Sequence, residues 1–79
     1  MSETLSKAVS NAISVFYNQC EGSGWNRASS EAFVKNISQV FETFSGATLQ
    51  DQTGLKSALL ICKRQGADTT EMEKFIPLN

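Results

Sequence analysis

The sequence contains no histidine. Histidine is the commonest general base and a frequent metal ligand near neutral pH, so its absence removes every Ser–His and Cys–His catalytic pairing. The two cysteines, Cys20 and Cys62, form no Cys-x-x-Cys pair, and together with eight scattered acidic residues they make no zinc site. We therefore expect a protein that is not an enzyme, with no catalytic residue, no metal ion and no cofactor.

An excess of charge of either sign is also lacking. The formal net charge is −1, and the only adjacent basic pair is Lys63 and Arg64. Nucleic-acid-binding domains usually carry a basic patch, and helices that lie on membrane surfaces carry a face rich in lysine and arginine. We therefore expect neither a nucleic acid nor a membrane as the partner.

Long apolar runs and targeting signals are missing as well. No apolar run approaches the ~20 residues of a membrane span, and the first ten residues, MSETLSKAVS, lack the charged-then-apolar pattern of a secretion signal. These absences predict a complete chain in the cytoplasm of the producing or host cell. In that compartment Cys20 and Cys62 are expected to be two small buried hydrophobic residues, with a disulfide between them as the alternative.

Ligand-binding loops fail on their spacing. The stretch 21–25, EGSGW, lacks the later glycine and the Lys-Ser/Thr pair of a phosphate-binding loop. If Glu31 were the last ligand of a calcium loop, the earlier ligand positions would fall on Cys20, Gly22 and Gly24, which carry no carboxylate. The layout of two helix pairs loosely resembles the small dimeric EF-hand proteins, so a degenerate switch module without calcium is one alternative function.

What the sequence does contain is an amphipathic helix predicted over Ser29 to Gly46, around which the rest of the chain is organised. Ser29 or Ser30 is predicted to cap its start, Glu31 falls in the first turn, and Gly46 follows its end. Its apolar residues recur at the three-and-four spacing of one helix face: Phe33, Ile37, Val40, Phe41 and Phe44.

A first helix is predicted from about Glu3 to Cys20, with Ser2 as its cap. Its apolar residues keep the helical period: Leu5, Ala8, Val9, Ala12, Ile13, Phe16 and Cys20. Its far face carries a row of small uncharged residues, namely Ser6, Ser10, Ser14 and Asn18. That row is either a solvated polar face or a surface that another helix can approach closely.

Two further helices complete the predicted fold. The third runs from about Leu49 to Gln65, with a break or restart near Thr53 and Gly54, and a capping box of Thr48 and Asp51. Its main stripe is Leu55, Ala58, Leu59 and Cys62, with Leu60 and Ile61 outside it on opposite sides. Gly66 ends this helix. A short fourth helix then presents Met72, Phe75 and Ile76, with Asp68 and Glu71 as its capping box and Pro77 as its stop.

The loop between the first two helices contains the only tryptophan, Trp25. It either folds back over the core or stands out as an anchor for a partner. If a partner surface exists, we expect it at Trp25, Arg27 and Tyr17. Lys63 and Arg64 are the second choice for such a surface. Self-association into a homodimer is predicted through exposed apolar residues outside the main stripes: Val15, Leu60 and Ile61.

The spacing of Cys62 and Gly66 suits a helix-turn-helix motif, with Cys62 as the small residue of the first helix and Gly66 as the glycine of the turn. Met72 and Phe75 would then face inward. Its reading helix would start at Asp68 and contain glutamates, which DNA phosphates repel. A small DNA-binding transcriptional regulator is therefore kept only as an alternative function.

The sequence thus predicts an all-α single domain over residues 1–79, a small four-helix orthogonal or bundle-like fold. The predicted function is a non-enzymatic protein–protein interaction module, a small inhibitor or regulator that binds a larger protein. Compact chains of this length without motifs are common among phage-encoded inhibitors of host machinery, including proteins that block CRISPR complexes.

Overall fold

The computed structural model describes residues 4–22 and 24–78, and these contain helices but no strand. The helices are α1 (Leu5–Cys20), α2 (Arg27–Thr43), α3 (Thr53–Arg64) and α4 (Thr70–Glu73). The predicted all-α fold class and the predicted order of three longer helices and a short C-terminal one are confirmed.

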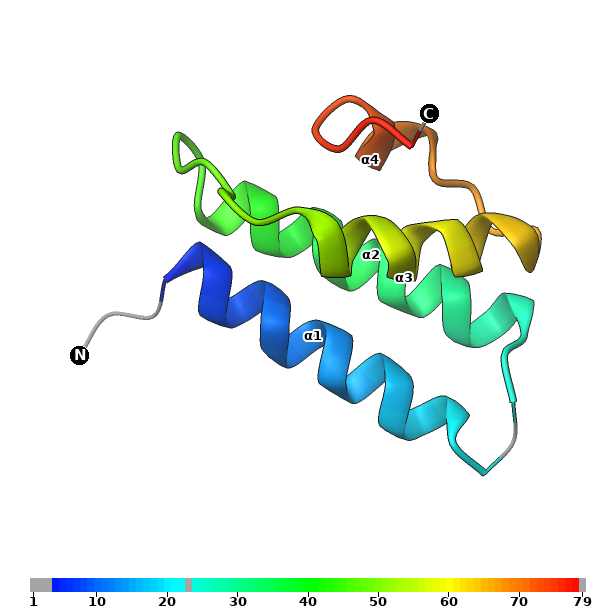
Figure 1. Cartoon of the computed structure of the whole chain (residues 1–79). Coiled ribbons are helices and arrows are strands. Elements are labelled where there is room, and N and C mark those ends of the chain that lie inside the picture. Colours follow the sequence, from blue (N-terminus) through cyan, green and yellow to red (C-terminus); the bar gives the residue numbers. More distant parts are fainter. Residues whose placement is uncertain (1–3, 23, 79) are drawn as a thin grey trace.

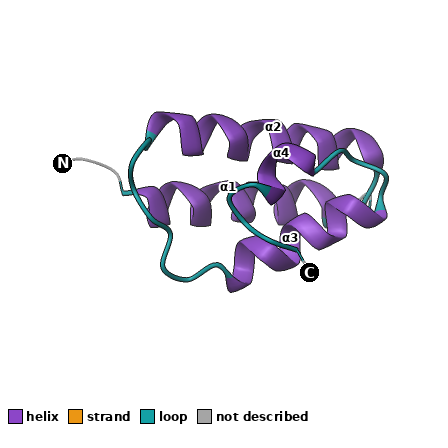
Figure 2. Ribbon diagram, turned by 90° about the horizontal axis from the view of Figure 1, so that it is seen from above, coloured by secondary structure: helices purple, strands orange, loops and turns teal. Residues whose placement is uncertain are grey.

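The helix α2 lies at the centre of the arrangement, since it contacts α1, α3 and α4. Figure 1 shows α2 and α3 as a layer with α1 below it and α4 above it. In the view from above, α1 lies beneath the seam between α2 and α3 (Figure 2). Hollows open on both sides of α1, one lined by α1 and α2 and the other by α1, the following loop and α3.

The core is built from the predicted stripes of these helices. Apolar side chains that are at most 1% exposed come from every helix and from the C-terminal segment: Phe16, Ile37, Leu55, Ala58, Leu59, Cys62, Met72 and Ile76. Val40, Phe41 and Phe44 of the organising stripe are only partly buried and pack around its edge. Burial of such side chains is the main force that holds so short a chain together.

The start of α1 is one place where the sequence prediction was wrong. The helix begins at Leu5, and Thr4 is its cap, because the Thr4 hydroxyl accepts a hydrogen bond from the backbone N–H of Lys7. Ser2 and Glu3 lie outside the described residues. The serine row of α1 faces solvent, with Ser6, Ser10, Ser14 and Asn18 all exposed.

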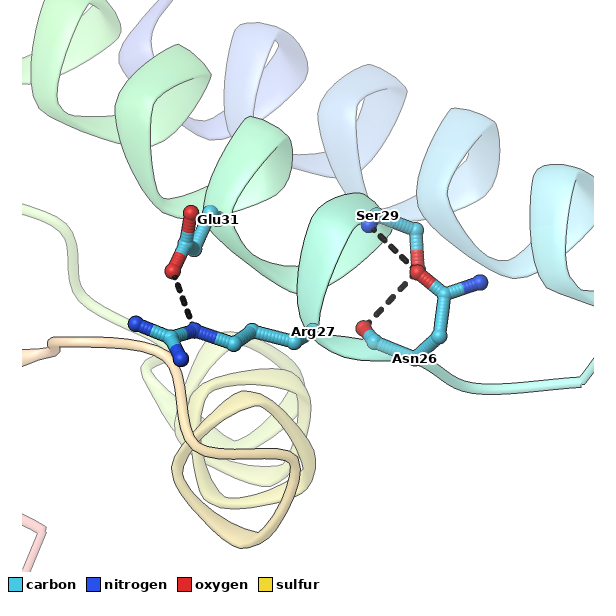
Figure 3. Close-up of polar contacts among 4 residues, drawn as sticks. All are labelled: Asn26, Arg27, Ser29 and Glu31. Carbon is cyan, nitrogen blue, oxygen red and sulfur yellow. Dashed lines mark hydrogen bonds and ion pairs between the residues drawn. The ribbon is translucent and has the colours of Figure 1, made fainter.

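The start of α2 differs for a related reason. Asn26 has an extended backbone, and its side-chain oxygen accepts from the backbone N–H of Ser29 at 2.8 Å, which places the cap three residues before Ser29 (Figure 3). Neither Ser29 nor Ser30 is therefore the cap. Glu31 lies beyond the first turn, where it pairs with Arg27 at 2.8 Å instead of stabilising the helix dipole.

The turns that follow α2 and α3 use glycine as predicted. Gly46 and Gly66 have φ angles of +92° and +89°, a region that disfavours any side chain. The predicted capping box of Thr48 and Asp51 is wrong, since the Asp51 carboxylate accepts from the backbone N–H of Thr53 and so marks the first residue of α3. Leu49 is buried but belongs to the preceding loop.

The C-terminal segment departs from the prediction in a similar way. The Asp68 carboxylate accepts from the backbone N–H of Thr70, so it forms a local turn and no capping box with Glu71. The helix α4 ends at Glu73, ahead of Pro77, and Phe75 lies outside it. Phe75 is 53% exposed and stacks on Phe41 at 5.3 Å between ring centroids, so it is not one of the inward-facing residues.

Candidate protein-interaction surface

A chain of four aromatic rings connects the core to the surface at the end of α1. Phe16 is buried and stacks on Phe33 of α2, with 4.5 Å between ring centroids. Trp25 lies on the other side of Phe16 at 5.1 Å, and Tyr17 meets Trp25 edge to face at 5.5 Å. Because these geometries are favourable for aromatic pairs, the two outer rings are held in place before any partner arrives.

The loop that carries Trp25 is fixed by the backbone at both ends. Gly24 has a φ of +77°, and its N–H donates to the carbonyl of Cys20 at 2.8 Å, which turns the chain back after α1. Asn26 then starts α2 directly after the tryptophan. The Trp25 ring contacts buried Phe16, yet 40% of the Trp25 surface is exposed, so the ring covers part of the core and also remains accessible from outside.

We call the surface formed by the rings of Tyr17 and Trp25 and the neighbouring aliphatic side chain of Ile61 the aromatic patch. Tyr17 is 38% exposed, and Ile61 of α3 is partly buried against the core. The three side chains, together with Asn18, Cys20 and Glu21, line a shallow, mostly apolar hollow of about 470 Å³ between α1 and α3. The hollow is open on one side and can receive an apolar side chain from another molecule.

The three basic residues that the sequence predicted for a partner surface do not line this hollow. The Arg27 guanidinium is held by Glu31 on α2, and its stem lies near the Gly66 turn, so it does not line the hollow (Figure 3). Lys63 points towards Glu73, 3.6 Å away. Arg64 is exposed and also does not line the hollow. The structure therefore joins Trp25 to Tyr17, as predicted, but not to the predicted cations.

Ile61 is the member of this site that the sequence assigned to a different role. In the sequence, Ile61 lies outside the main stripe of α3, and this position predicts that Ile61 contributes to self-association. Leu60, on the other side of α3, lines a separate hollow near Asp51 and Lys56. Both side chains are partly buried, so part of their apolar surface is already used within the fold.

The two cysteines are free and buried, as the sequence analysis expected. The Cys20 thiol lies 3.6 Å from the Ser29 hydroxyl. Burial raises the pKa of Cys62 from 9.0 to about 11; the neighbouring Ser30 hydroxyl opposes this shift and Cys20 adds to it. Because the reactive form of cysteine is the thiolate, this environment keeps Cys62 inert at neutral pH.

The raised pKa predicts a loss of stability in alkali. Below pH 9 the thiol is neutral in both states, but between pH 9 and about 11 only the unfolded chain releases its proton, which favours unfolding. The free energy of unfolding should therefore fall by about 2 kcal/mol more between pH 8 and pH 10.5 in the native protein than in Cys62→Ala. Urea unfolding of both proteins at the two pH values measures this difference, and equal losses would contradict it.

Other kinds of site were sought over residues 4–22 and 24–78. No group of three or more Cys, Asp or Glu side chains there could hold a metal ion. None of the helices in that part of the chain is long and apolar enough to cross a membrane. The predicted reading helix of a helix-turn-helix corresponds to α4, which has four residues and includes Glu71 and Glu73.

Comparisons with known protein families, with curated proteins and with solved structures find no match to this chain. A function therefore has to be argued from the geometry of the aromatic patch and from the charge of the surfaces around it.

Proposed function

We propose that the protein is a small, non-enzymatic interaction module that inhibits or regulates a larger protein by binding it through the aromatic patch. It would do so in the cytoplasm of the producing or host cell. The observation that carries this proposal is the pair of exposed rings, Tyr17 and Trp25, which rest on buried Phe16 beside an open apolar hollow.

Rigid, exposed aromatic rings are the side chains that most often dominate protein–protein binding energy. Binding costs free energy whenever a side chain has to be ordered, by about 0.5–1.5 kcal/mol for a flexible one. Tyr17 and Trp25 are already ordered by their mutual contact and by Phe16. We therefore expect the partner to be a protein that places an aliphatic or aromatic side chain between Trp25 and Ile61.

The test uses the full chain, immobilised and exposed to an extract of the cell in which it is made. The wild-type protein is expected to retain a defined partner. Tyr17→Arg is expected to lose it, because the substitution removes one of the two exposed rings that would contact the partner. A loss of affinity of at least about 30-fold is expected, equivalent to ~2 kcal/mol at a central contact. Titration of the identified partner against both proteins measures it.

Ser14→Arg is the matched control, since Ser14 is exposed on the same helix and does not line the hollow. It should bind the partner as the wild-type protein does, and both variants should keep the wild-type melting temperature within a few degrees. Equal binding by Tyr17→Arg would overturn the aromatic patch as the site. Binding of random DNA duplex with an affinity that falls steeply with salt would instead support the alternative of a DNA-binding regulator.

A further inference from the structure

A second surface, on the opposite side of α1 from the aromatic patch, carries no ionisable side chain at all. We call it the α1–α2 groove. It consists of two adjoining hollows of about 400 and 100 Å³ that share Ala12, Val15 and Asn36. The residues that line the two hollows are Ala8, Asn11, Ala12, Val15, Phe16, Gln19, Ala32, Phe33, Asn36, Gln39, Val40, Thr43 and Phe44.

The charges of both helices lie away from this groove. The only charged residue of α1 is Lys7, and it lines neither hollow. On α2 the charged positions are Arg27, Glu31, Lys35 and Glu42, and none of them lines either hollow. A solvated face on a domain with 15 Lys, Arg, Asp and Glu residues (7 + 8) would be expected to include some of them, so this neutrality needs an explanation.

The groove combines apolar side chains with neutral amides. Val15 is 50% exposed and stands between the two hollows. Alanines at positions 8, 12 and 32 keep the floor low, so that another helix can approach. Asn36, which lines both hollows, and Gln39 belong to α2, and their side-chain amides both donate and accept hydrogen bonds.

From these observations we infer that the α1–α2 groove is the interface of a homodimer, in which a second copy of this chain packs its own groove against the first. In a two-fold interface the same surface meets itself, so the groups close to the axis face their own copies. Amides satisfy this condition because a donor can face an acceptor, whereas any charge near the axis would face a like charge. A partner with charged residues would bury them here without a counter-charge, which is strongly unfavourable.

The size of the face places this dimer among the smaller specific interfaces, where weak, reversible association is usual. The 16 residues of α1 span about 24 Å, and two neighbouring helices are about 20 Å wide, which gives roughly 500 Å² per protomer. About 1,000 Å² in total is at the low end of specific interfaces. The dimer is therefore expected to be reversible, with a dissociation constant on the order of tens of micromolar.

Sedimentation equilibrium of the full chain between about 10 and 300 µM tests this inference, since that range brackets the expected dissociation constant. The average mass of the wild-type protein should rise with concentration towards twice the monomer mass. Val15→Arg should stay monomeric throughout, because it places two like charges together at the centre of the interface. Asn36→Lys should do the same from α2, and it carries the test if Val15→Arg does not fold.

Ser14→Arg adds the same charge to α1 outside the groove and should dimerise as the wild-type protein does. A wild-type protein that stays monomeric up to 300 µM, or a dimer that survives both groove variants, would overturn the inference. A dimer that is lost in Tyr17→Arg but kept in Val15→Arg would overturn it too, by placing self-association at the aromatic patch. Because partner capture depends on Tyr17 and self-association on Val15, the two proposals fail separately.

Discussion

Replacing Phe16 by Ala is expected to destabilise the fold by about 3–5 kcal/mol, the usual cost of removing a buried phenylalanine. Phe16 is 1% exposed, stacks on Phe33 and supports both Tyr17 and Trp25 from below. A domain of this size is stable by only about 3–5 kcal/mol, so the variant should be largely unfolded at 37 °C. Circular dichroism during thermal and urea unfolding measures the loss.

Phe16→Leu is the matched control for this experiment. It keeps most of the apolar volume and loses mainly the ring contacts, so a smaller loss of about 1–1.5 kcal/mol is expected. The same variant should also weaken binding at the aromatic patch, because Trp25 loses the ring on which it lies. If the free energy of unfolding of Phe16→Ala lies within 1 kcal/mol of the wild-type value, Phe16 does not pack in the core as described above.

Replacing Ile76 by Ala is expected to cost about 2–5 kcal/mol, although Ile76 is the fourth residue from the C-terminus and belongs to no helix. Ile76 is 1% exposed and, with Met72, is part of the core. Removal of its side chain leaves a cavity and loosens the C-terminal segment from α2. Urea unfolding at neutral pH gives the free-energy difference directly.

Phe75→Ala is the comparison that makes this second prediction specific. Phe75 is larger than Ile76 and adjacent to it, but it is 53% exposed and contacts mainly the ring of Phe41. Its removal is therefore expected to cost less than about 1.5 kcal/mol, the range of one aromatic pair. A larger loss from Phe75→Ala than from Ile76→Ala would show that the C-terminal segment packs differently.

The ends of the helices illustrate how far local sequence patterns can be trusted. Thr4 and Asn26 cap α1 and α2, whereas Ser2, Ser29 and Ser30 were expected to do so. Serine, threonine and asparagine all cap helices well, and the choice among neighbouring residues depends on which of them takes an extended backbone when the loop packs. The glycines after α2 and α3 were predictable because few other residues tolerate a positive φ.

The candidate sites were only half visible in the sequence. Trp25 and Tyr17 were singled out correctly as neighbours, and Val15 was recognised as an apolar residue outside the main stripe of its helix. Ile61 could not be joined to Tyr17 before the packing of α1 against α3 was known. The neutrality of the α1–α2 groove was equally hidden, because its residues come from two helices whose relative rotation no local pattern specifies.

Within the residues that the structure describes, the sequence by itself determined the four helices, their apolar stripes and the glycine turns after α2 and α3. The physical reason is that helical periodicity and backbone preference are local properties, which can be recognised within a few helical turns of sequence. Only the tertiary structure decided that Phe75 lies outside while Ile76 is buried, that Arg27 turns to Glu31, and that Trp25 both covers the core and remains exposed. These outcomes depend on which surfaces meet when the helices pack. Side chains from segments far apart in the chain compete for burial, and local sequence does not show which of them become buried.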